Sequence, residues 1–557
     1  MKRLFTLLMG SLAACCVMAV PAKRGVWRLL TLADGTQVEA LLTGDECLHY
    51  WQTADGQQLV EGPDDGLAVA ADMGRLRSKA RNRASLEQRC RQQHRAHLGR
   101  HNGFRGSKRG LVILVEFANQ TFQAGHDSLL YTRICNEQGF TSDEGFRGSV
   151  HDYFLDQSYG VFDLTFDVCG PVVMPENYQY YGTDLKESGD DAHAGEMVAM
   201  ACQAIADNVN FADYDWDGDD EVDQVLCVYA GRGQADGGTS STIWPHEWVL
   251  AESDYGHKLE LQGVTIDTYA VVNERSSRGI AGIGTICHEF AHCLGLPDMY
   301  DTESSGCYGL NDWSLMDQGN YNGNSFCPAG LTSFERYSCG WLKPTELGSA
   351  DTLIVAIPPL SQQPEAYIVR NDAWTDEYFM IENRQQQGWD SKLPGRGLLV
   401  LHVDFDSIIW ENNIVNAIVK AGNADSLPPN NHQRCALLRA SESWGLYSST
   451  YDAYPYQGND SITNTSMPAA KLYHPSSDGT FLLNRGILGI TPNAGGTISF
   501  RYRATATELT ETPNAEGIQV VGASPVSPHG AFTLSGQPVA VPRKGVYIET
   551  GRKRLGR

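Results

Sequence analysis

The chain is short of positive charge and of long apolar runs. It contains 43 Lys and Arg against 67 Asp and Glu, so its formal net charge is −24. Surfaces that bind nucleic acid need an excess of Lys and Arg, which excludes nucleic acid as an expected partner. After the first 22 residues no apolar run is long enough to span a bilayer, so we expect no transmembrane segment there. An acidic surface favours solubility and suits hard cations such as calcium.

Dense cysteine spacing is also absent. The 14 cysteines of the 557-residue chain lack the spacing of a small disulfide-stapled domain. Cys287 and Cys293 lie on one expected helix, with their Cα atoms about 9 Å apart. That separation is too large for a disulfide between them. We therefore expect both side chains to pack in a core.

Residues 1–22 have the features of a signal peptide. Two cations precede an apolar run, and small residues follow it, so cleavage is expected after Ala19 or Ala22. The alternative is a lipoprotein signal, because the stretch from Leu12 to Cys15 fits a lipobox and would anchor the chain through Cys15. Both interpretations predict export, to the cell surface or beyond it.

Composition divides the rest of the chain into four parts. Asp34-Gly35 and Asp55-Gly56 predict hairpins, and the stretch that follows is basic, with twelve Lys or Arg and one acid between residues 75 and 109. That stretch is either a solvated linker helix or an exposed processing region, and the two are compatible. The expected parts are an N-terminal propeptide-like segment with a basic linker (23–105), a catalytic domain (106–345), a β-rich domain (346–503) and a linker with a C-terminal sorting-like tail (504–557).

Hydrophobic periodicity predicts a mixture of strands and helices in the catalytic part. Apolar β-branched runs predict strands at 110–118, 224–231 and 268–274. Helical spacing predicts helices over 191–208 and 284–294. Beyond about residue 350, short apolar runs separated by turns predict a β-rich region.

The stretch "HEFAHCLGLPD", residues 288–298, has the spacing of a zinc site. Residues four apart on a helix share one face, so His288 and His292 can present their rings to one ion. Zinc accepts imidazole nitrogens and prefers four ligands. Gly295 is expected to end the helix in a left-handed conformation, and Asp298 can then reach the ion as third ligand.

Glu289 favours a catalytic site over two alternatives that stay open, an ordinary buried helix and a closed structural zinc site. A structural site would need a fourth protein ligand and would leave Glu289 without a task. In a catalytic site Glu289 faces the open coordination position. There it can act as general base toward a zinc-activated water.

The pattern HExxHxxGxxD resembles that of metzincin metallopeptidases, with Asp in place of the usual third His. The run "HEFAHCLGLPDMYD", followed by "GLNDWSLMDQG", resembles the M6 family of immune inhibitor A-like peptidases over roughly residues 110–500. The resemblance implies an α+β fold. It would comprise a metzincin-like zincin catalytic domain, with a mixed sheet and an active-site helix, followed by a β-rich C-terminal domain.

The resemblance also assigns roles to individual residues. Met316 would form the methionine turn beneath the zinc, although a core methionine is the alternative. By analogy with metzincins, the strand 268–274 would form the sheet edge that pairs with an extended substrate. Tyr321 is a candidate for stabilising the oxyanion, against the alternative of an exposed loop tyrosine.

The acidic stretch "FADYDWDGDDEVDQV" (211–225) predicts a calcium loop, with a solvated acidic turn as alternative. The M6 relatives usually have glycine at its sixth position, whereas this chain has Asp220, which tolerates a left-handed turn less well. A second register beginning at Asp213 places Gly218 correctly but lacks the closing carboxylate. In the first register, positions 1, 3, 5, 7 and 9 are Asp215, Asp217, Asp219, Glu221 through its carbonyl, and Asp223.

The sequence therefore predicts a secreted, zinc-dependent endopeptidase that is made as a latent precursor. We expect calcium as a second metal, with a stabilising role in the acidic loop. We expect protein or peptide substrates and a monomer. Cys47 and Cys90 are candidates, by residue type alone, for a thiolate that blocks the zinc in the precursor. The alternatives are a surface adhesin whose metal sites are structural, and a zinc hydrolase of a non-peptide amide.

Overall fold

The structure of the chain is a computed structural model. It describes residues 20–45, 47–61, 67–76, 104–185, 190–303, 305–420, 427–441, 448 and 450–505, together with five strand segments between 519 and 556. Cys15, Cys90 and the predicted cleavage point at Ala19 lie outside the described residues. No helix within the described part of the chain is long and apolar enough to cross a bilayer.

Five short strands near the N-terminus form an antiparallel sheet in the order β1-β2-β3-β4-β5. Both predicted hairpins are confirmed, because Gly35 (φ 83°) joins β1 to β2 and Gly56 (φ 90°) joins β3 to β4. Glycine occupies this left-handed region without a Cβ clash. The strands are β1 (Trp27–Thr31), β2 (Gln37–Gly44), β3 (His49–Thr53), β4 (Gln58–Glu61) and β5 (Ala68–Ala70).

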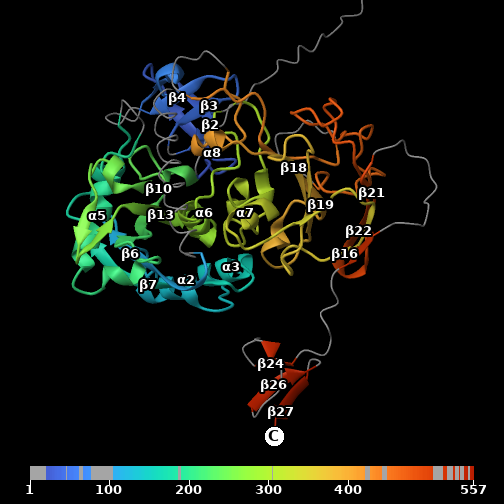
Figure 1. Ribbon diagram of the computed structural model, residues 1–557. Helices are drawn as coiled ribbons and strands as arrows, with labels where there is room; N and C mark the ends of the chain where they lie inside the picture. The colour runs from blue at the N-terminus through green and yellow to red at the C-terminus, as the bar shows by residue number, and fades with distance from the viewer. Residues whose placement is uncertain are drawn as a thin grey trace, which may run out of the picture.

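A six-stranded mixed sheet forms the centre of the part of the chain predicted to be catalytic, residues 106–345, which is called the catalytic part below (Figure 1). Its main order is β10-β13-β9-β6-β7, and β10 alone of these five runs antiparallel to its neighbour. The three strands predicted from the sequence are confirmed as β6, β9 and β13. The strands are β6 (Gly106–Glu116), β7 (Phe162–Val173), β9 (Val225–Arg232), β10 (His246–Val249), β13 (Thr268–Ser276) and β14 (Gly279–Ile280), which pairs with β13.

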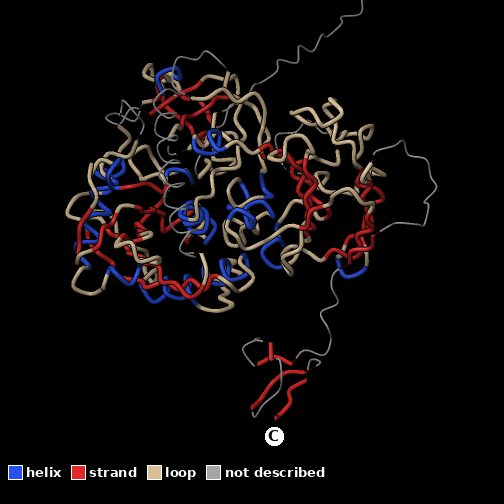
Figure 2. The backbone as a smooth tube through the Cα atoms, in the orientation of Figure 1, coloured by secondary structure: helices blue, strands red, loops and turns tan. Residues whose placement is uncertain are grey.

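Helices cover both faces of this sheet (Figure 2). Alternate residues of one strand enter different cores: Val112 and Leu114 of β6 pack with α2, α3 and α6, whereas Leu111 and Ile113 pack with α5. This alternation is what period-two apolar strands produce when both faces are buried. The helices are α2 (Ser128–Asn136), α3 (Val150–Gln157), α5 (Ala194–Ile205) and α6 (Ile283–Cys293).

The expectation that the strand 268–274 forms the edge of the sheet is wrong. β13 lies between β10 and β9, and pairs with both. The end of the strand order is β10, only four residues long and beginning with two polar residues, His246 and Glu247. Such a short stretch gives no clear strand signal in the sequence, which is why the analogy selected its longer, more apolar neighbour.

Two further sheets follow residue 344. The first has the order β15-β17-β18-β19-β20 and the second has the order β21-β22-β16-β23. Short apolar runs beyond residue 350 lie in these strands. The strands are β15 (Thr345–Glu346), β16 (Thr352–Ile357), β17 (Tyr367–Arg370), β18 (Glu377–Arg384), β19 (Gly397–Asp404), β20 (Cys435–Leu437), β21 (Gly486–Pro492), β22 (Ile498–Arg503) and β23 (Gln519–Gly522).

The remaining elements are short. They include α4 (Tyr178–Gly182), α7 (Ser333–Ser338), α8 (Ser407–Glu411) and a small sheet of β8 (Glu221–Val222), β11 (Leu259–Leu261) and β12 (Val264–Ile266). The 3-10 helices are η1 (Phe211–Tyr214), η2 (Gln234–Asp236), η3 (Leu250–Glu252), η4 (Asn311–Trp313), η5 (Gln318–Tyr321), η6 (Gly388–Lys392) and η7 (Ala494–Gly496). A final sheet contains β24 (Ala531–Thr533), β25 (Pro538–Val539), β26 (Gly545–Glu549) and β27 (Arg552–Gly556).

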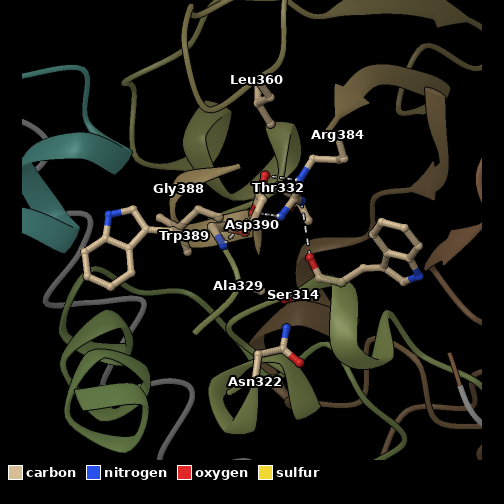
Figure 3. Close-up of polar contacts among 12 residues, drawn as sticks. Ser314, Asn322, Ala329, Thr332, Leu360, Arg384, Gly388, Trp389 and Asp390 are labelled. Atoms are coloured by element: carbon tan, nitrogen blue, oxygen red, sulfur yellow. Dashed lines mark hydrogen bonds and ion pairs between the residues drawn. The ribbon is translucent and has the colours of Figure 1, made fainter. Parts of the chain in front are cut away.

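A buried ion cluster joins the catalytic part to the sheet that contains β18 (Figure 3). The guanidinium of Arg384, at the end of β18, donates two hydrogen bonds to Asp390 (2.8 and 2.6 Å) and one to Glu382 (3.1 Å). It also donates to the carbonyls of Trp313 (3.2 Å) and Gly330 (2.9 Å). All five donor positions of the guanidinium are thereby used, as a fully buried arginine requires.

Candidate metal centre

Helix α6 carries the predicted zinc motif and is buried along its whole length. Its start packs tightly against the loop around η5, because a Cβ at Gly284 would lie 1.8 Å from the carbonyl oxygen of Asn320. Glycine alone allows this approach. Phe290 and Ile286 anchor the helix in the core, and this anchoring fixes the face on which the histidines stand.

The helix ends as the sequence predicts. Gly295 adopts φ 75°, and its N–H donates to the carbonyl of His292 (2.7 Å). The chain then doubles back, so that the carbonyl of Leu296 accepts a hydrogen bond from Nδ1 of His292 (2.8 Å). Because that carbonyl can only accept, Nδ1 carries the proton and Nε2 keeps its lone pair for a metal.

The three predicted zinc ligands converge. Oδ1 of Asp298 lies 3.4 Å from Nε2 of His288 and 3.5 Å from Nε2 of His292. All three side chains are fully buried, and they form a group able to hold one metal ion. Nδ1 of His288 bonds the carbonyl of Leu315 (2.8 Å), which leaves Nε2 for the ion as in His292. Two imidazole nitrogens and one carboxylate oxygen are the donor set of a catalytic zinc site with one open position.

Glu289 is fully buried beside the first ligand. Its carboxylate lies close enough to two phenols to act on them electrostatically. Burial raises the pKa of Tyr229 well above its ordinary value, and the charges of Asp191 and Glu289 add to the effect. Burial likewise raises the pKa of Tyr321, with further contributions from Asp236 and Glu289.

Met316, the residue predicted to form the methionine turn, is fully buried. Its N–H donates to Oγ of Ser314 (3.0 Å), and its carbonyl accepts from the N–H of Met299 (2.8 Å). Leu315, which supplies the carbonyl for His288, immediately precedes it. The turn therefore supports both the first histidine and the segment that carries the aspartate.

Tyr321 is half-buried at the end of η5, rather than on an exposed loop. Its hydroxyl donates a 2.6 Å hydrogen bond to the carbonyl of Pro21, near the N-terminus. Nε1 of Trp244 donates to the neighbouring carbonyl of Val20 (3.1 Å). Sequence reasoning missed this contact, because residues 20–22 have the composition of the end of a signal peptide.

The acidic loop brings three of its predicted ligands together. The carboxylates of Asp215, Asp217 and Asp219 form a group with ligand atoms within 4.8 Å of one another. Asp223 is buried next to them, and its pKa is raised to about 9, first by burial and then by these three carboxylates. The carboxylate of Glu221 pairs with Lys258 instead (2.9 Å), which agrees with a role for Glu221 through its carbonyl only.

Asp220 adopts φ 65° at the sixth position of the loop. This is the left-handed conformation that a glycine usually provides there, and aspartate is among the few other residues that enter it. Asp220 therefore takes up the left-handed conformation expected at this position.

Cys47 lies away from the metal ligands. It packs in a small cluster with Leu48, Tyr50 and Leu76, and it is absent from the group of ligand atoms around His288 among the described residues. The thiol is buried. Cys287 and Cys293 are also buried and unbridged, as predicted.

Comparison with known proteins finds a match to one peptidase family in the part of the chain that contains this site. Residues 101–349 match the family described as "Immune inhibitor A peptidase M6, catalytic domain". The pre-pro-metalloprotease PrtV of Vibrio cholerae is 26% identical over 249 residues, covering 38% of this chain and 27% of the relative. Immune inhibitor A of Bacillus thuringiensis subsp. alesti is 24% identical over 287 residues, covering 42% of this chain and 41% of the relative.

The chain thus spans between about a quarter and two fifths of the length of these relatives. The matched part contains all three converging ligands and the glutamate beside them. Over residues 101–349 the chain therefore matches the catalytic domain of the M6 peptidases.

Proposed function

We propose that this protein is an exported zinc endopeptidase that is made as a latent precursor. One observation carries the proposal: His288, His292 and Asp298 converge in a fully buried position, with Glu289 directly beside them. The family match to residues 101–349 supports the same reaction class. The N-terminal pattern of cations, apolar run and small residues supports export.

In peptide hydrolysis His288, His292 and Asp298 would hold the zinc ion, and Glu289 would transfer protons. Zinc, when bound, would polarise the scissile carbonyl and lower the pKa of a water molecule. Glu289 takes the proton from the attacking water and delivers it to the leaving nitrogen. Its burial excludes bulk water, which strengthens the electrostatic effect of every charge in the site.

An extended substrate would pair with β10, the strand at the end of the central sheet order. Pairing with a sheet edge supplies main-chain hydrogen bonds that do not depend on the substrate sequence. Trp244 and Tyr321, both in contact with residues 20–21, border the same region. Tyr321 is suited to stabilise the oxyanion once its hydroxyl is released from Pro21.

Latency is supported by the way in which the N-terminal segment contacts the catalytic part. Lys23 donates its N–H to the carbonyl of Ala235 (2.9 Å) and its ammonium pairs with Asp236 (3.0 Å). Arg24 pairs with Asp312 (3.2 Å), four residues before Met316. Together with the bond from Tyr321 to Pro21, these contacts tie the N-terminal segment to the side chains of Asp236, Asp312 and Tyr321. Removal of the N-terminal segment would expose them.

The test compares wild-type protein with Glu289→Ala after removal of the N-terminal segment. We expect wild type to degrade casein or gelatin, to lose activity with a zinc chelator and to regain it with added zinc. Glu289→Ala should bind zinc normally but lose at least about 10²- to 10⁴-fold in rate, the contribution of a general base. If neither wild type nor the variant cleaves these substrates, the result would favour the alternative of a surface adhesin with structural metal sites.

We also propose that the acidic loop binds calcium, and that the bound ion fixes the segment just before β9. Three clustered carboxylates and the left-handed turn at Asp220 support this proposal. Calcium should raise the melting temperature of wild type and leave that of Asp215→Asn almost unchanged. An equal response of the two proteins would show that calcium acts elsewhere.

We further propose that the chain contains a metzincin-like catalytic domain and a separate β-rich domain. A metzincin-like catalytic domain at 106–345 is supported by the mixed sheet, by helix α6 and by the turn at Met316. A β-rich domain at 346–503 is supported by the two sheets that follow β15. Limited proteolysis should release fragments near these boundaries.

A further inference from the structure

The loop that carries Asp298 is held by a segment from far along the chain. Residues 412–416 follow α8, well beyond residue 349, where the match to the M6 catalytic domain ends. Nδ2 of Asn416 donates to the carbonyl of Met299 (2.7 Å), and Oγ1 of Thr302 donates to the carbonyl of Asn413 (2.6 Å). The two segments are therefore joined along several residues.

Asn413 contacts the predicted zinc ligand itself, and does so twice. Its Nδ2 donates a 2.7 Å hydrogen bond to Oδ2 of Asp298. Its Oδ1 accepts a 3.0 Å hydrogen bond from the N–H of Asp298. With Oδ2 engaged by the amide, the other oxygen, Oδ1, is the one that faces the two histidines at 3.4 and 3.5 Å.

The surroundings fix Asn413 in this orientation. The residue is buried and its backbone has φ 50°, a left-handed conformation that asparagine enters more readily than most residues. The next residue, Ile414, has its carbonyl bonded by Nδ2 of Asn430 (2.9 Å). Hydrogen bonds from neighbouring residues therefore fix the backbone that carries the amide of Asn413.

We infer that Asn413 is a positioning residue for the metal centre and that the C-terminal part of the chain completes that centre. The inference rests on the proposed zinc site. A carboxylate ligand held through its second oxygen loses little freedom when it binds the ion, and groups that hold metal ligands in this way typically contribute 10- to 100-fold in metal affinity. A carboxylate in place of this amide could not donate the hydrogen bond and would repel Asp298.

Metal affinity of the full-length chain tests the inference without relying on peptidase activity. Metal-free wild type, Asn413→Asp and Asn413→Gly are titrated with Zn²⁺ in competition with a chromophoric chelator. Asn413→Asp keeps the side-chain volume and an acceptor for the N–H of Asp298. Asn413→Gly keeps the left-handed backbone and removes both bonds. The control is Asn416→Ala, which also loses two buried hydrogen bonds, one to Met299 and one from Cys435, but does not touch Asp298.

We expect both Asn413 variants to bind Zn²⁺ about 10- to 100-fold more weakly than wild type, and Asn416→Ala to bind it almost as tightly. The absorption spectrum of the Co²⁺-loaded protein should change in the Asn413 variants alone, because the spectrum reports ligand geometry. Equal zinc affinity in wild type and Asn413→Asp, or equal weakening in Asn416→Ala, would overturn the inference. A wild-type chain that binds no zinc would overturn the proposed function as well, so the wild-type titration separates the two failures.

Discussion

At the scale of single residues, the metal centre depends on hydrogen bonds that fix each side chain before an ion arrives. The carbonyls of Leu315 and Leu296 set the orientation of the two histidines. The first carbonyl is fixed in turn by the hydrogen bonds of Met316, and the second by the end of α6. The position of the ligands is therefore a consequence of backbone geometry around α6, and substitutions far from the ligands can disturb it.

Arg384 gives a prediction at this scale. Substitution by methionine would leave Asp390 and Glu382 as buried carboxylates without their guanidinium, so we expect a loss of about 3–5 kcal/mol in the free energy of unfolding. Denaturant titration measures this loss. The control is Arg503→Ala, which removes a partly exposed ion pair with Asp351 and should cost less than about 1 kcal/mol. Similar losses in both variants would contradict the role assigned to the buried cluster.

At the scale of elements, the close approach of α6 to the loop around η5 places the metal ligands relative to Tyr321. Gly284→Ala would place a Cβ 1.8 Å from a backbone oxygen, so we expect overpacking to cost about 1–3 kcal/mol or more. Gly348→Ala is the matched control, because nothing lies within 4 Å of a Cβ there. Thermal unfolding of both variants measures the difference. Equal stability would show that α6 and the loop separate easily.

The contact between the N-terminal sheet and the catalytic part contains a titratable pair. Nε2 of His49, in β3, lies 3.1 Å from Oδ2 of Asp184. Burial lowers the pKa of His49, but the charge and hydrogen bond of Asp184 together with the contacts of Asp45 outweigh it, so that the pKa lies above the ordinary 6.5. Burial also raises the pKa of Asp184, which sets the lower limit of the pH range in which both groups are charged.

This pair predicts that the N-terminal segment is held less tightly at higher pH. After release the pKa of His49 returns to about 6.5, so the contribution of the pair is fully present below that pH. It is lost as the pH rises through the higher pKa of the bound state. Size-exclusion chromatography of chain cleaved between residues 76 and 104 should show more free N-terminal fragment as the pH increases. His49→Phe, which can still stack on Trp244 but cannot titrate, should abolish this dependence. If the pH dependence persisted in His49→Phe, another titratable group would have to cause it.

At the scale of the whole molecule, the site combines a short motif with contacts from distant parts of the chain. His288, His292 and Asp298 could be predicted because helical periodicity and one glycine turn bring residues of an eleven-residue stretch together. Asn413 could not, since its contact with Asp298 spans 115 positions and "ENNIVN" has the composition of an ordinary turn. The contact of Pro21 with Tyr321 spans 300 positions and was equally out of reach.

The central claim is that His288, His292 and Asp298 bind one zinc ion beside Glu289. Anomalous diffraction from a crystal of the zinc-loaded protein, recorded on both sides of the zinc absorption edge, tests it most directly. We predict one peak per chain within about 2.0–2.2 Å of Nε2 of both histidines and of Oδ1 of Asp298. A zinc-loaded crystal without a peak at this position, or with its only peak elsewhere, would contradict the account.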